Sequence, residues 1–577
     1  MKYRQLEVDA FKTHGLFFVD RLEQEALASS FPFASIFSVG QALFAIGFRI
    51  TEVSLPAIRT HSAKITILPA FCAAVARRSA CCSLGFVLRN VVPIFPDFSH
   101  PATVLHGCLA RFCKDPPKPV PGKLRRLRRF VRRYVRKHYE PLSADTDLSL
   151  ETWLAGTGYP EWRKEELRRV WAAKPWCDTA DLENKSFCKK EHYTAYKPAR
   201  GINSRTDTFK CATGPAFKAI ETVMYRQPCF DGLRLVEGEQ GPFIKHIPVH
   251  LRPQFLERMF RGSDGPFYET DYSQFEKHFT PEVLRSIEFI LYEHMLQNFP
   301  DTLSLIRRAL AGTNKCRYSG FILKIRGRRM SGDMCTSLGN GFSNHMLFLF
   351  CASEKGGVAY GVVEGDDALF VCTVELSSQD FLDVGFDIKI LLHRNLYSTS
   401  FCGMLSSSDG IILRDPARVV PKFGWTFSPR RLGGLAVRMG LLRARALSLA
   451  YESPRCPIIS SLAKRALEVT YGFRPIFETD AYHADVSAWV RLFGNHMERE
   501  LALGPSLTSR IDFAEAFGIS VPLQIRIEEI FSAWDGAPLS HPLVDLLFER
   551  CHGMQDFAER YVASSAGSII SLADEAA

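Results

Sequence analysis

The clearest pattern of apolar and polar positions in the chain is a pair of β-rich runs around an acidic turn. "YGVV" precedes, and "ALFVCTV" follows, the tetrapeptide from Glu364 to Asp367. This pattern predicts a β-hairpin with Asp366 and Asp367 at its tight turn. A charge held among apolar residues has to be paired or bound to a metal ion. The hairpin therefore predicts a metal site; a plain surface turn is the alternative if the hairpin stood alone.

A second strand-like run, "FYETDY", lies upstream and ends beside Asp271. Thr280 and Pro281 then have the residue types of a helix N-cap and a first helical position, so a helix follows. Asp271 is expected at a strand end, where its carboxylate projects over a sheet; the alternative is a simple capping role. Together with Asp366 it could hold two metal ions about 4 Å apart, and carboxylate ligands suit Mg²⁺.

Two further segments have polar groups in a regular arrangement. In "RRMSGDMCTSLGNGFSNHML", a loop at Ser331-Gly332 precedes Thr336, Asn340 and Asn344, whose spacing predicts one polar face on an apolar helix. A polar face on an otherwise apolar helix needs something to bind, and a ribose hydroxyl would satisfy it. Further upstream, "SFCKKEHYTAYKPARGINSRTDTFK" contains cations suited to a triphosphate, although an isolated basic loop would mean little. These cations are Lys189, Lys190, Lys197, Arg200 and Arg205.

The remaining chain divides by pattern into an apolar start, a basic helix and a helical end. Residues 1–116 are apolar, and Ala26 to Phe48 is uncharged and long enough to cross a bilayer, although a buried or interfacial helix is the alternative. The Pro-rich stretch 114–123 predicts a domain boundary. The helix predicted next has an apolar face and a dense positive face, which favours phosphate binding to RNA or lipid over a merely solvated surface. From about residue 430 the pattern is mainly helical.

Composition supports a polyanionic partner and a reducing compartment. The 577 residues have a net charge of +10, with 46% hydrophobic and 23% charged residues, as in a folded protein with basic surfaces. The 16 cysteines include no C-x-x-C pair, which favours structural thiols in a cytosolic protein. The first residues lack the apolar segment of a secretory signal.

Taken together, the order of the motifs resembles that of viral RNA-dependent RNA polymerases over roughly residues 150 to 430. That order is a basic clamp, D-x4-[DE], S-G-x3-T-x3-N and G-D-D, and "RRMSGDMCTSLGNG" and "VEGDD" are most similar to tombusvirus-like and noda-like replicases. The resemblance implies an α+β right-hand fold with fingers, a palm with an antiparallel sheet, and a mainly helical thumb. It implies an N-terminal apolar region (1–116), a linker and basic helix (117–149), fingers (150–265), a palm with an inserted fingers segment (266–425) and a thumb with a C-terminal region (426–577).

The resemblance also assigns roles to individual residues. Asp271, Asp366 and Asp367 match the metal aspartates, and Lys389, in "DVGFDIKI", is a candidate general acid for the pyrophosphate. The residues expected to bind the nucleotide are Lys189, Lys190, Glu191, Lys197, Arg200, Glu276, Ser331, Gly332, Thr336 and Asn340. On the basic helix, RNA binding is expected from Lys123, Arg125, Arg126, Arg128, Arg129, Arg132 and Arg133. "FCGMLSSSDGIILRDP" resembles the element that grips the growing strand, and "WLAGTGYPEWRKEE" the motif where the template enters.

The chain departs from the family's pattern at Glu276, where the family usually has Asp. The longer side chain can still accept a hydrogen bond from a 2′-hydroxyl, but its tip lies one methylene further out, so the departure bears on sugar discrimination.

The expected function is replication of a viral RNA genome by two-metal nucleotidyl transfer with Mg²⁺, or Mn²⁺ in its place. The expected partners are RNA, NTPs, a host membrane surface and other viral replication proteins, in the host cytoplasm. The rival interpretations are a reverse transcriptase, which would normally have an aromatic residue in place of Gly365, and a non-catalytic membrane scaffold.

Overall fold

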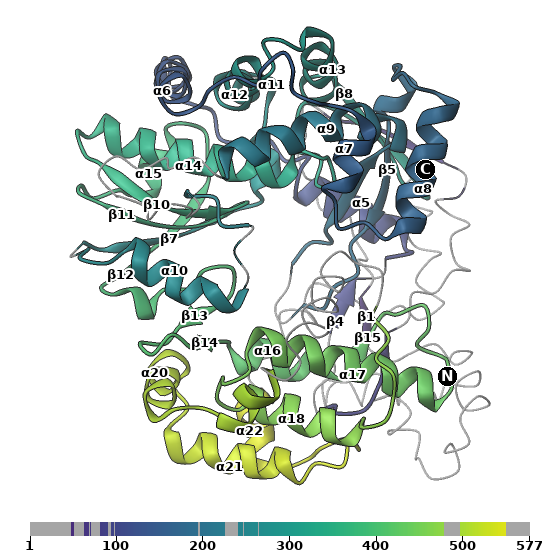
Figure 1. Cartoon of the computed structure of the whole chain (residues 1–577), viewed down its shortest axis with the longest axis vertical. Helices are drawn as coiled ribbons and strands as arrows, with labels where there is room; N and C mark the ends of the chain where they lie inside the picture. Colours follow the sequence, from purple (N-terminus) through teal and green to yellow (C-terminus); the bar gives the residue numbers. More distant parts are fainter. Residues whose placement is uncertain are drawn as a thin grey trace, which may run out of the picture.

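The fold is seen in a computed structural model (Figure 1). It describes residues 48–50, 63–68, 70, 81–89, 94–96, 98–193, 197–225, 241–245, 247, 249–263, 265–477 and 497–549. Three groups of elements can be followed in Figure 1: a four-stranded sheet with its helices, a five-stranded sheet with its helices, and a C-terminal group of helices.

A four-stranded antiparallel sheet lies at one side of the molecule (Figure 1). Its order is β10–β11–β7–β12, formed by Ala359–Glu364, Asp367–Cys372, Phe267–Tyr272 and Ile388–His393. Successive side chains of a strand point to opposite faces. Tyr268 and Tyr272 of β7 therefore join one core and Phe267 joins another. The predicted strand "FYETDY" and the predicted G-D-D hairpin are both confirmed.

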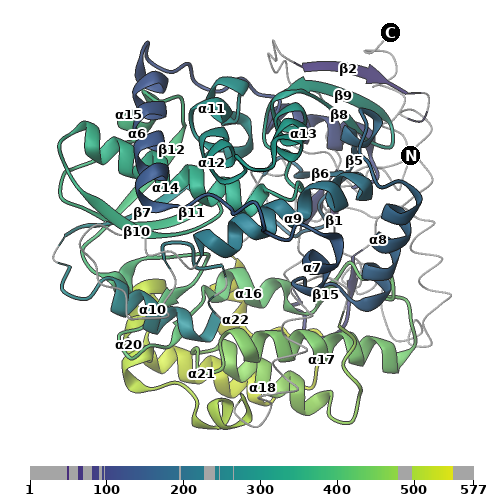
Figure 2. The same ribbon diagram turned by 45° about the horizontal axis from the view of Figure 1, so that its top comes forward.

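Helices cover one face of this sheet (Figures 1 and 2). The longest, α14 (Thr336–Glu354), packs along it, and Phe348 stacks on Phe370 of β11 with ring centroids 4.0 Å apart. The basic helix α6 (Lys123–His138) packs outside α14, α11 (Pro281–Ser286) and α12 (Glu288–Met295). Its buried residues are Leu127, Val131, Tyr134 and Val135, as its apolar face predicts.

The second sheet joins segments that are far apart in the sequence. Its order is β2–β9–β8–β5–β6, and only the β5–β8 pair is parallel. Figure 2 shows β2 at the outer edge of this sheet. The strands are Ala63–Ile67, Phe321–Arg326, Thr313–Arg317, Asn184–Cys188 and Gly201–Arg205. Around it lie α5 (Pro101–Ala110), α7 (Leu150–Ala155), α8 (Glu161–Ala173), α9 (Asp207–Met224) and α13 (Pro300–Ala311).

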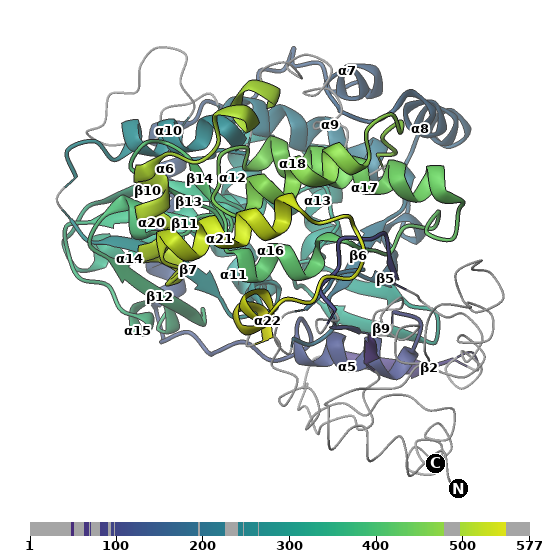
Figure 3. The ribbon, with the colours of Figure 1, turned by 90° about the horizontal axis from the view of Figure 1, so that it is seen from below.

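The C-terminal part is mainly helical, as its pattern predicts, and its helices lie together when the molecule is seen from below (Figure 3). They are α16 (Pro416–Phe423), α17 (Leu435–Glu452), α18 (Ile459–Val469), α20 (Leu507–Phe517), α21 (Val521–Ser532) and α22 (Pro542–Glu549). The other elements are β1 (Phe48–Ile50), β3 (Cys82–Ser83), β4 (Ile94–Pro96), α10 (Arg252–Met259), α15 (Ser378–Leu382), β13 (Leu405–Ser406), β14 (Ile412–Leu413), β15 (Trp425–Thr426) and 3₁₀ turns at Ala180–Leu182, Val249–Leu251, Phe275–His278 and Leu396–Ser398.

The described parts of residues 1–116 pack into both neighbouring groups. β2 extends the five-stranded sheet, β3 pairs with β15, and Leu84, Phe86 and Leu88 enter the core of the C-terminal helices. The boundary expected near residue 116 therefore marks no break in packing. Among the described residues no helix has the length and apolar character needed to span a bilayer. The apolar stretch from Ala26 almost to its end at Phe48 lies outside them.

Candidate active site

Three aspartates gather at one end of the four-stranded sheet. Asp271 is the solvent-exposed, next-to-last residue of β7, and its neighbour Thr270 pairs with Ala368 of β11. One further step along this antiparallel register sets Asp271 opposite Asp367, and directly opposed residues lie on the same face of a sheet. Asp366 and Asp367 are also solvent-exposed. The predicted strand-end and hairpin-turn positions are therefore those observed.

The hairpin turn needs the glycine that precedes the aspartates. Glu364 pairs with Asp367 across the hairpin, which leaves Gly365 and Asp366 as a two-residue turn. Gly365 has a φ of 66°, in the left-handed region, and Asp366 has no positive φ. A glycine with positive φ at the first central position is the pattern of a type II′ turn, whose twist matches the flanking strands. Residue 365 thus fixes where the two carboxylates point.

The electrostatics of this cluster indicate uncompensated negative charge. Desolvation by the surrounding protein, with repulsion from Asp366 and Asp271, raises the pKa of Asp367 to about 7. Desolvation also raises the pKa of Asp366; Glu276 and Asp271 raise it further, whereas Arg200 lowers it. Solvent-exposed carboxylates with raised pKa values are suited to bind a cation, because an added positive charge would favour their ionised forms.

The donor chemistry fits a hard divalent ion. Mg²⁺ prefers oxygen ligands and is typically held by one or two carboxylates plus substrate phosphates, and the exposed aspartates offer such oxygens. Within the described ranges, no group of three or more His, Cys, Asp or Glu side chains is arranged to hold a metal ion. The metal role of Asp271, Asp366 and Asp367 therefore stays a prediction.

Asn344 ties the hairpin turn to helix α14. Its side-chain amide donates to the carbonyl of Asp366 at 2.9 Å and to that of Gly365 at 3.4 Å. Its Oδ1 accepts from the Tyr272 hydroxyl at 3.2 Å, and the side chain is fully buried. The third member of the predicted polar face therefore needs no ligand, because it holds the turn in place.

The other members of that face also find partners within the protein. The Thr336 hydroxyl bonds the carbonyls of Asp333 at 2.8 Å and Met330 at 3.2 Å. Asn340 Oδ1 accepts from Arg329 Nε at 2.8 Å. The inference that a polar face on an apolar helix requires a bound ligand was thus wrong as a general argument. Thr336 and Asn340 are half-buried, and their roles towards a nucleotide remain predictions.

Two neighbouring residues of the loop before α14, Ser331 and Gly332, lie against the backbone of Asn203. The Ser331 carbonyl accepts from the backbone N–H of Asn203 at 2.8 Å. Gly332 has a φ of 127°, and a Cβ there would lie 2.7 Å from the Asn203 carbonyl oxygen. Only glycine fits this close approach, which accounts for the Ser331-Gly332 pair independently of any ligand.

Sequence analysis did not predict a buried ion pair that lies behind this loop. Arg329 and Glu288, with side chains 1% and 0% exposed, form a direct pair, and the guanidinium lies 4.2 Å above the Phe279 ring. The Tyr292 and Ser343 hydroxyls donate to the same carboxylate at 3.0 and 3.3 Å. An acidic residue in the apolar run "SIEFILYEHML" was the available signal.

The predicted nucleotide clamp lies at the end of the β5–β6 hairpin. The Lys189 N–H bonds the Arg200 carbonyl at 2.8 Å, so the two residues flank the loop, and both reach Glu191, at 3.2 and 3.7 Å. Lys190 and Lys197 are exposed.

Arg205 is not available to a nucleotide. Its side chain is 1% exposed and pairs with Asp333 at 2.8 Å, so the triphosphate role that its place in the basic segment suggested is wrong.

Glu276 has a partner from outside the polymerase motifs. Arg111 Nε donates to Glu276 Oε1 at 2.9 Å, and the two side chains are 14% and 17% exposed. Sequence analysis could not predict this pair, because Arg111 lies in a segment without motifs. On the other side of the aspartates, Lys389 of β12 is the direct cross-strand partner of Asp271. Its ammonium group is exposed on the face that carries Asp271.

The basic residues of α6 lie on the outer surface of the fold. Arg126 and Lys123 are partly neutralised by Glu354, at 2.9 and 3.4 Å. A cavity of about 500 Å³ runs along the helix beside Phe350 and is lined by Arg126, Arg129, Arg132, Arg133 and Arg136. Arg125 and Arg128 are exposed as well.

Carboxylates at the turn and end of an antiparallel sheet, next to a basic hairpin loop, define a site suited to phosphoryl transfer. A family model described as viral RNA-dependent RNA polymerase matches residues 110–389. This part of the chain is therefore similar to a viral RNA-dependent RNA polymerase domain.

RNA-directed RNA polymerases of three viruses are similar to this chain in sequence. The chain is 25% identical over 449 residues to the RNA-directed RNA polymerase of maize chlorotic mottle virus, covering 72% of this chain and 43% of that protein. It is 24% identical over 336 residues to that of Panicum mosaic virus, covering 55% and 33%. For tobacco necrosis virus strain A the identity is 25% over 350 residues, covering 54% and 44%. The alignments thus span less than half the length of these relatives.

Proposed function

We propose that the protein is an RNA-dependent RNA polymerase that copies a viral RNA genome by template-directed, two-metal nucleotidyl transfer. The observation that supports this most is the meeting of Asp271, Asp366 and Asp367 at one sheet end, inside the region that matches the polymerase family. The proposed substrates are NTPs and an RNA template.

The proposed layout is a right hand. The four-stranded sheet with α14 would be the palm, the five-stranded sheet with its helices the fingers, and α16 to α22 the thumb. The carboxylates then lie at the palm surface and the loop from Lys189 to Arg200 on the fingers.

In the proposed reaction, the 3′-hydroxyl oxygen of the growing strand attacks the α-phosphorus of an NTP. The new phosphodiester bond forms as the α–β anhydride bond breaks, and pyrophosphate leaves. Divalent ions, Mg²⁺ in our proposal, would lower the pKa of the hydroxyl and neutralise the leaving oxygens when bound by Asp271, Asp366 and Asp367. Lys389, opposite Asp271, would donate a proton to the pyrophosphate.

The remaining predicted residues would hold the nucleotide. Arg200, whose positive charge already lowers the pKa of Asp366, would contact the triphosphate with Lys189, Lys190 and Lys197. Asn340 and Glu276 would hydrogen-bond the ribose, and Glu276 is held ready for this by Arg111.

The further partners are also proposals. The exposed arginines of α6 would bind RNA through its phosphates. Host membranes and other viral replication proteins in the cytoplasm remain the expected surroundings.

Template-directed NTP incorporation by the purified protein tests this proposal. We expect incorporation with Mg²⁺ that is abolished in Asp366→Asn, because a carboxamide is a poor ligand for this ion. Asp145→Asn, at an exposed aspartate before α7, is the matched control and should keep full activity. Full activity in a folded Asp366→Asn protein would remove the assignment. Comparable use of dNTPs would favour the reverse transcriptase alternative, and no incorporation by any preparation would favour the scaffold.

A further inference from the structure

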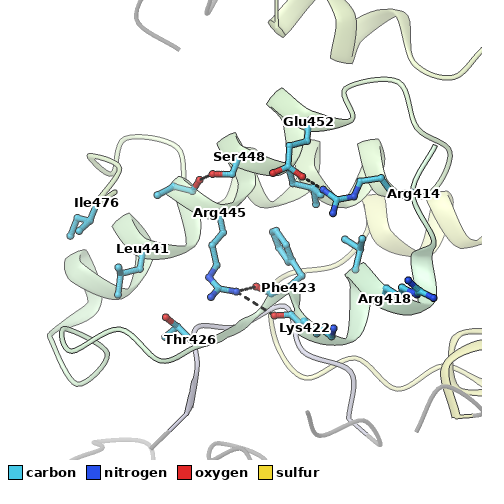
Figure 4. A pocket seen from close by; sticks show the side chains of 13 residues that line it. Arg414, Arg418, Lys422, Phe423, Thr426, Leu441, Arg445, Ser448, Glu452 and Ile476 are labelled. Carbon is cyan, nitrogen blue, oxygen red and sulfur yellow. Dashed lines mark hydrogen bonds and ion pairs between the residues drawn. The ribbon is translucent and has the colours of Figure 1, made fainter. Parts of the chain in front are cut away.

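A basic cavity lies between two helices of the C-terminal group, next to the segment that resembles the element gripping the growing strand (Figure 4). Its volume is about 260 Å³, close to the lower end of the range of small-ligand pockets. Four cations and one carboxylate line it: Arg414, Arg418, Lys422, Arg445 and Glu452.

The cations are presented by the regular spacing of the two helices. Arg418 and Lys422 lie one turn apart on α16, Arg414 lies just before that helix, and Arg445 and Glu452 lie two turns apart on α17. Residues four apart share a helix face. The cavity therefore has a basic wall built into the fold rather than a chance group of surface side chains.

Part of this charge is already neutralised. Arg414 forms an ion pair with Glu452 at one end of the cavity, and Arg418, at the rim, reaches Asp415 at 3.3 Å. Arg445 extends from α17 to the end of α16, where it donates to the carbonyls of Phe423 at 3.1 Å and Lys422 at 3.3 Å (Figure 4). Carbonyl groups satisfy its N–H donors without cancelling its charge.

Lys422 carries the least compensated charge of the set. Among the described residues no carboxylate forms an ion pair with its ammonium group, although the side chain is half-buried. Burial lowers its pKa first, and the positive charges of Lys197 and Arg418 lower it further. An anion in the cavity would relieve this repulsion.

We propose that the cavity between α16 and α17 binds the phosphate groups of a nucleotide, at a site separate from the catalytic carboxylates. Lys422 would contact the phosphates and Arg445 would contribute its positive charge, since clustered cations attract phosphate oxygens. The apolar wall of Leu441, Val419 and Ile476 would receive the less polar part of the ligand. A free NTP and the 5′ end of an RNA offer the same triphosphate chemistry.

The cavity also adjoins the predicted clamp. The charges of Lys197 and Glu191, both in the clamp, shift the pKa of Lys422. His192 from the same loop stacks on Phe427, with ring centroids 4.4 Å apart. A ligand that neutralises Lys422 would thus act on the loop that carries Arg200.

Binding without catalysis tests the site. Anisotropy of a fluorescent ATP is measured on the full chain in EDTA at low salt, so that no divalent ion supports binding at the aspartates. We expect binding that Lys422→Gln weakens about tenfold and that Lys464→Gln, at an exposed lysine of α18, leaves unchanged. Arg445→Gln should weaken it too, but Arg445 also caps α16, so Lys422 is the cleaner probe.

The comparison with the predicted clamp decides between the two sites. EDTA-resistant binding that is lost in Arg200→Ala but kept in a folded Lys422→Gln protein would overturn the proposal, as would absence of EDTA-resistant binding. Inorganic triphosphate should compete with the fluorescent ATP whether the natural ligand is a free NTP or the 5′ end of an RNA. Stronger competition by a 5′-triphosphorylated RNA than by the same RNA with a 5′-hydroxyl, and than by ATP, would identify the RNA end; the reverse order would identify the free nucleotide.

Discussion

Replacing Asn344 by alanine should misplace the G-D-D turn without touching a carboxylate. The buried side chain makes two well-formed hydrogen bonds, from Tyr272 at 3.2 Å and to the Asp366 carbonyl at 2.9 Å, and a longer one to Gly365. Each such bond contributes about 1 kcal/mol net, and a buried partner left unsatisfied costs about 1–3 kcal/mol. We therefore expect a loss of about 2–4 kcal/mol, seen as a Tm lower by several degrees.

The catalytic effect should be larger than the loss of stability alone implies. A turn that shifts by about 1 Å can lower the rate by about 100-fold, so single-nucleotide extension by the folded Asn344→Ala protein should be about 10–100-fold slower. Asn340→Ala, one helical turn earlier, is the comparison, because it should change the choice of sugar more than the rate. The reasoning fails if Asn344→Ala has the wild-type Tm and extension rate.

Four further outcomes are expected. Arg329→Met should destabilise the protein by about 3–5 kcal/mol, because it leaves Glu288 buried without its partner, and adding Glu288→Gln should restore part of the Tm. Burial and the nearby Lys277 lower the pKa of His278 to about 3, so between pH 3 and 6.5 the unfolded chain binds a proton that the folded chain does not bind. The stability of the protein should therefore fall as the pH drops through about 6.5, by about 2 kcal/mol at pH 5. His278→Gln should make Tm depend less steeply on pH. Glu276→Asp should lower the ratio of rNTP to dNTP incorporation because the shorter arm loses Arg111, and equal ratios in Glu276→Asp, Glu276→Ala and wild type would exclude Glu276 from sugar sensing. Neutralising four exposed arginines of α6 should flatten the salt dependence of RNA binding, and an unchanged slope would mean that the helix is only a solvated face.

The elements around the site were predictable because their signals are local. The hairpin follows from two apolar runs and a glycine, the helix of Thr280 from its cap and proline, and α14 from the repeat of Thr336 and Asn340. Each pattern spans a few turns or one hairpin, and nothing distant overrides it.

The contacts that hold the site were not predictable, because they join residues far apart in the sequence. Arg111 and Glu276 are separated by 165 positions, and Arg205 and Asp333 by 128. In the sequence Arg205 looks like its exposed neighbours, and only the fold shows that it is buried against an acid. A single sequence gives the type of each polar residue, but it does not indicate which ones are already satisfied.

The site separates the positioning of its carboxylates from their use. Asn344 bonds the backbone carbonyls of Gly365 and Asp366, so the turn is fixed from behind, while the side chains of Asp366 and Asp367 stay open to solvent. Had the protein fixed these aspartates through their carboxylates, the same oxygens would not be available to a cation. Desolvation raises the pKa values of Asp366 and Asp367, and repulsion from the neighbouring acids raises them further. Because the turn is held through its backbone, the oxygens of these two acids stay available to a cation that would neutralise them.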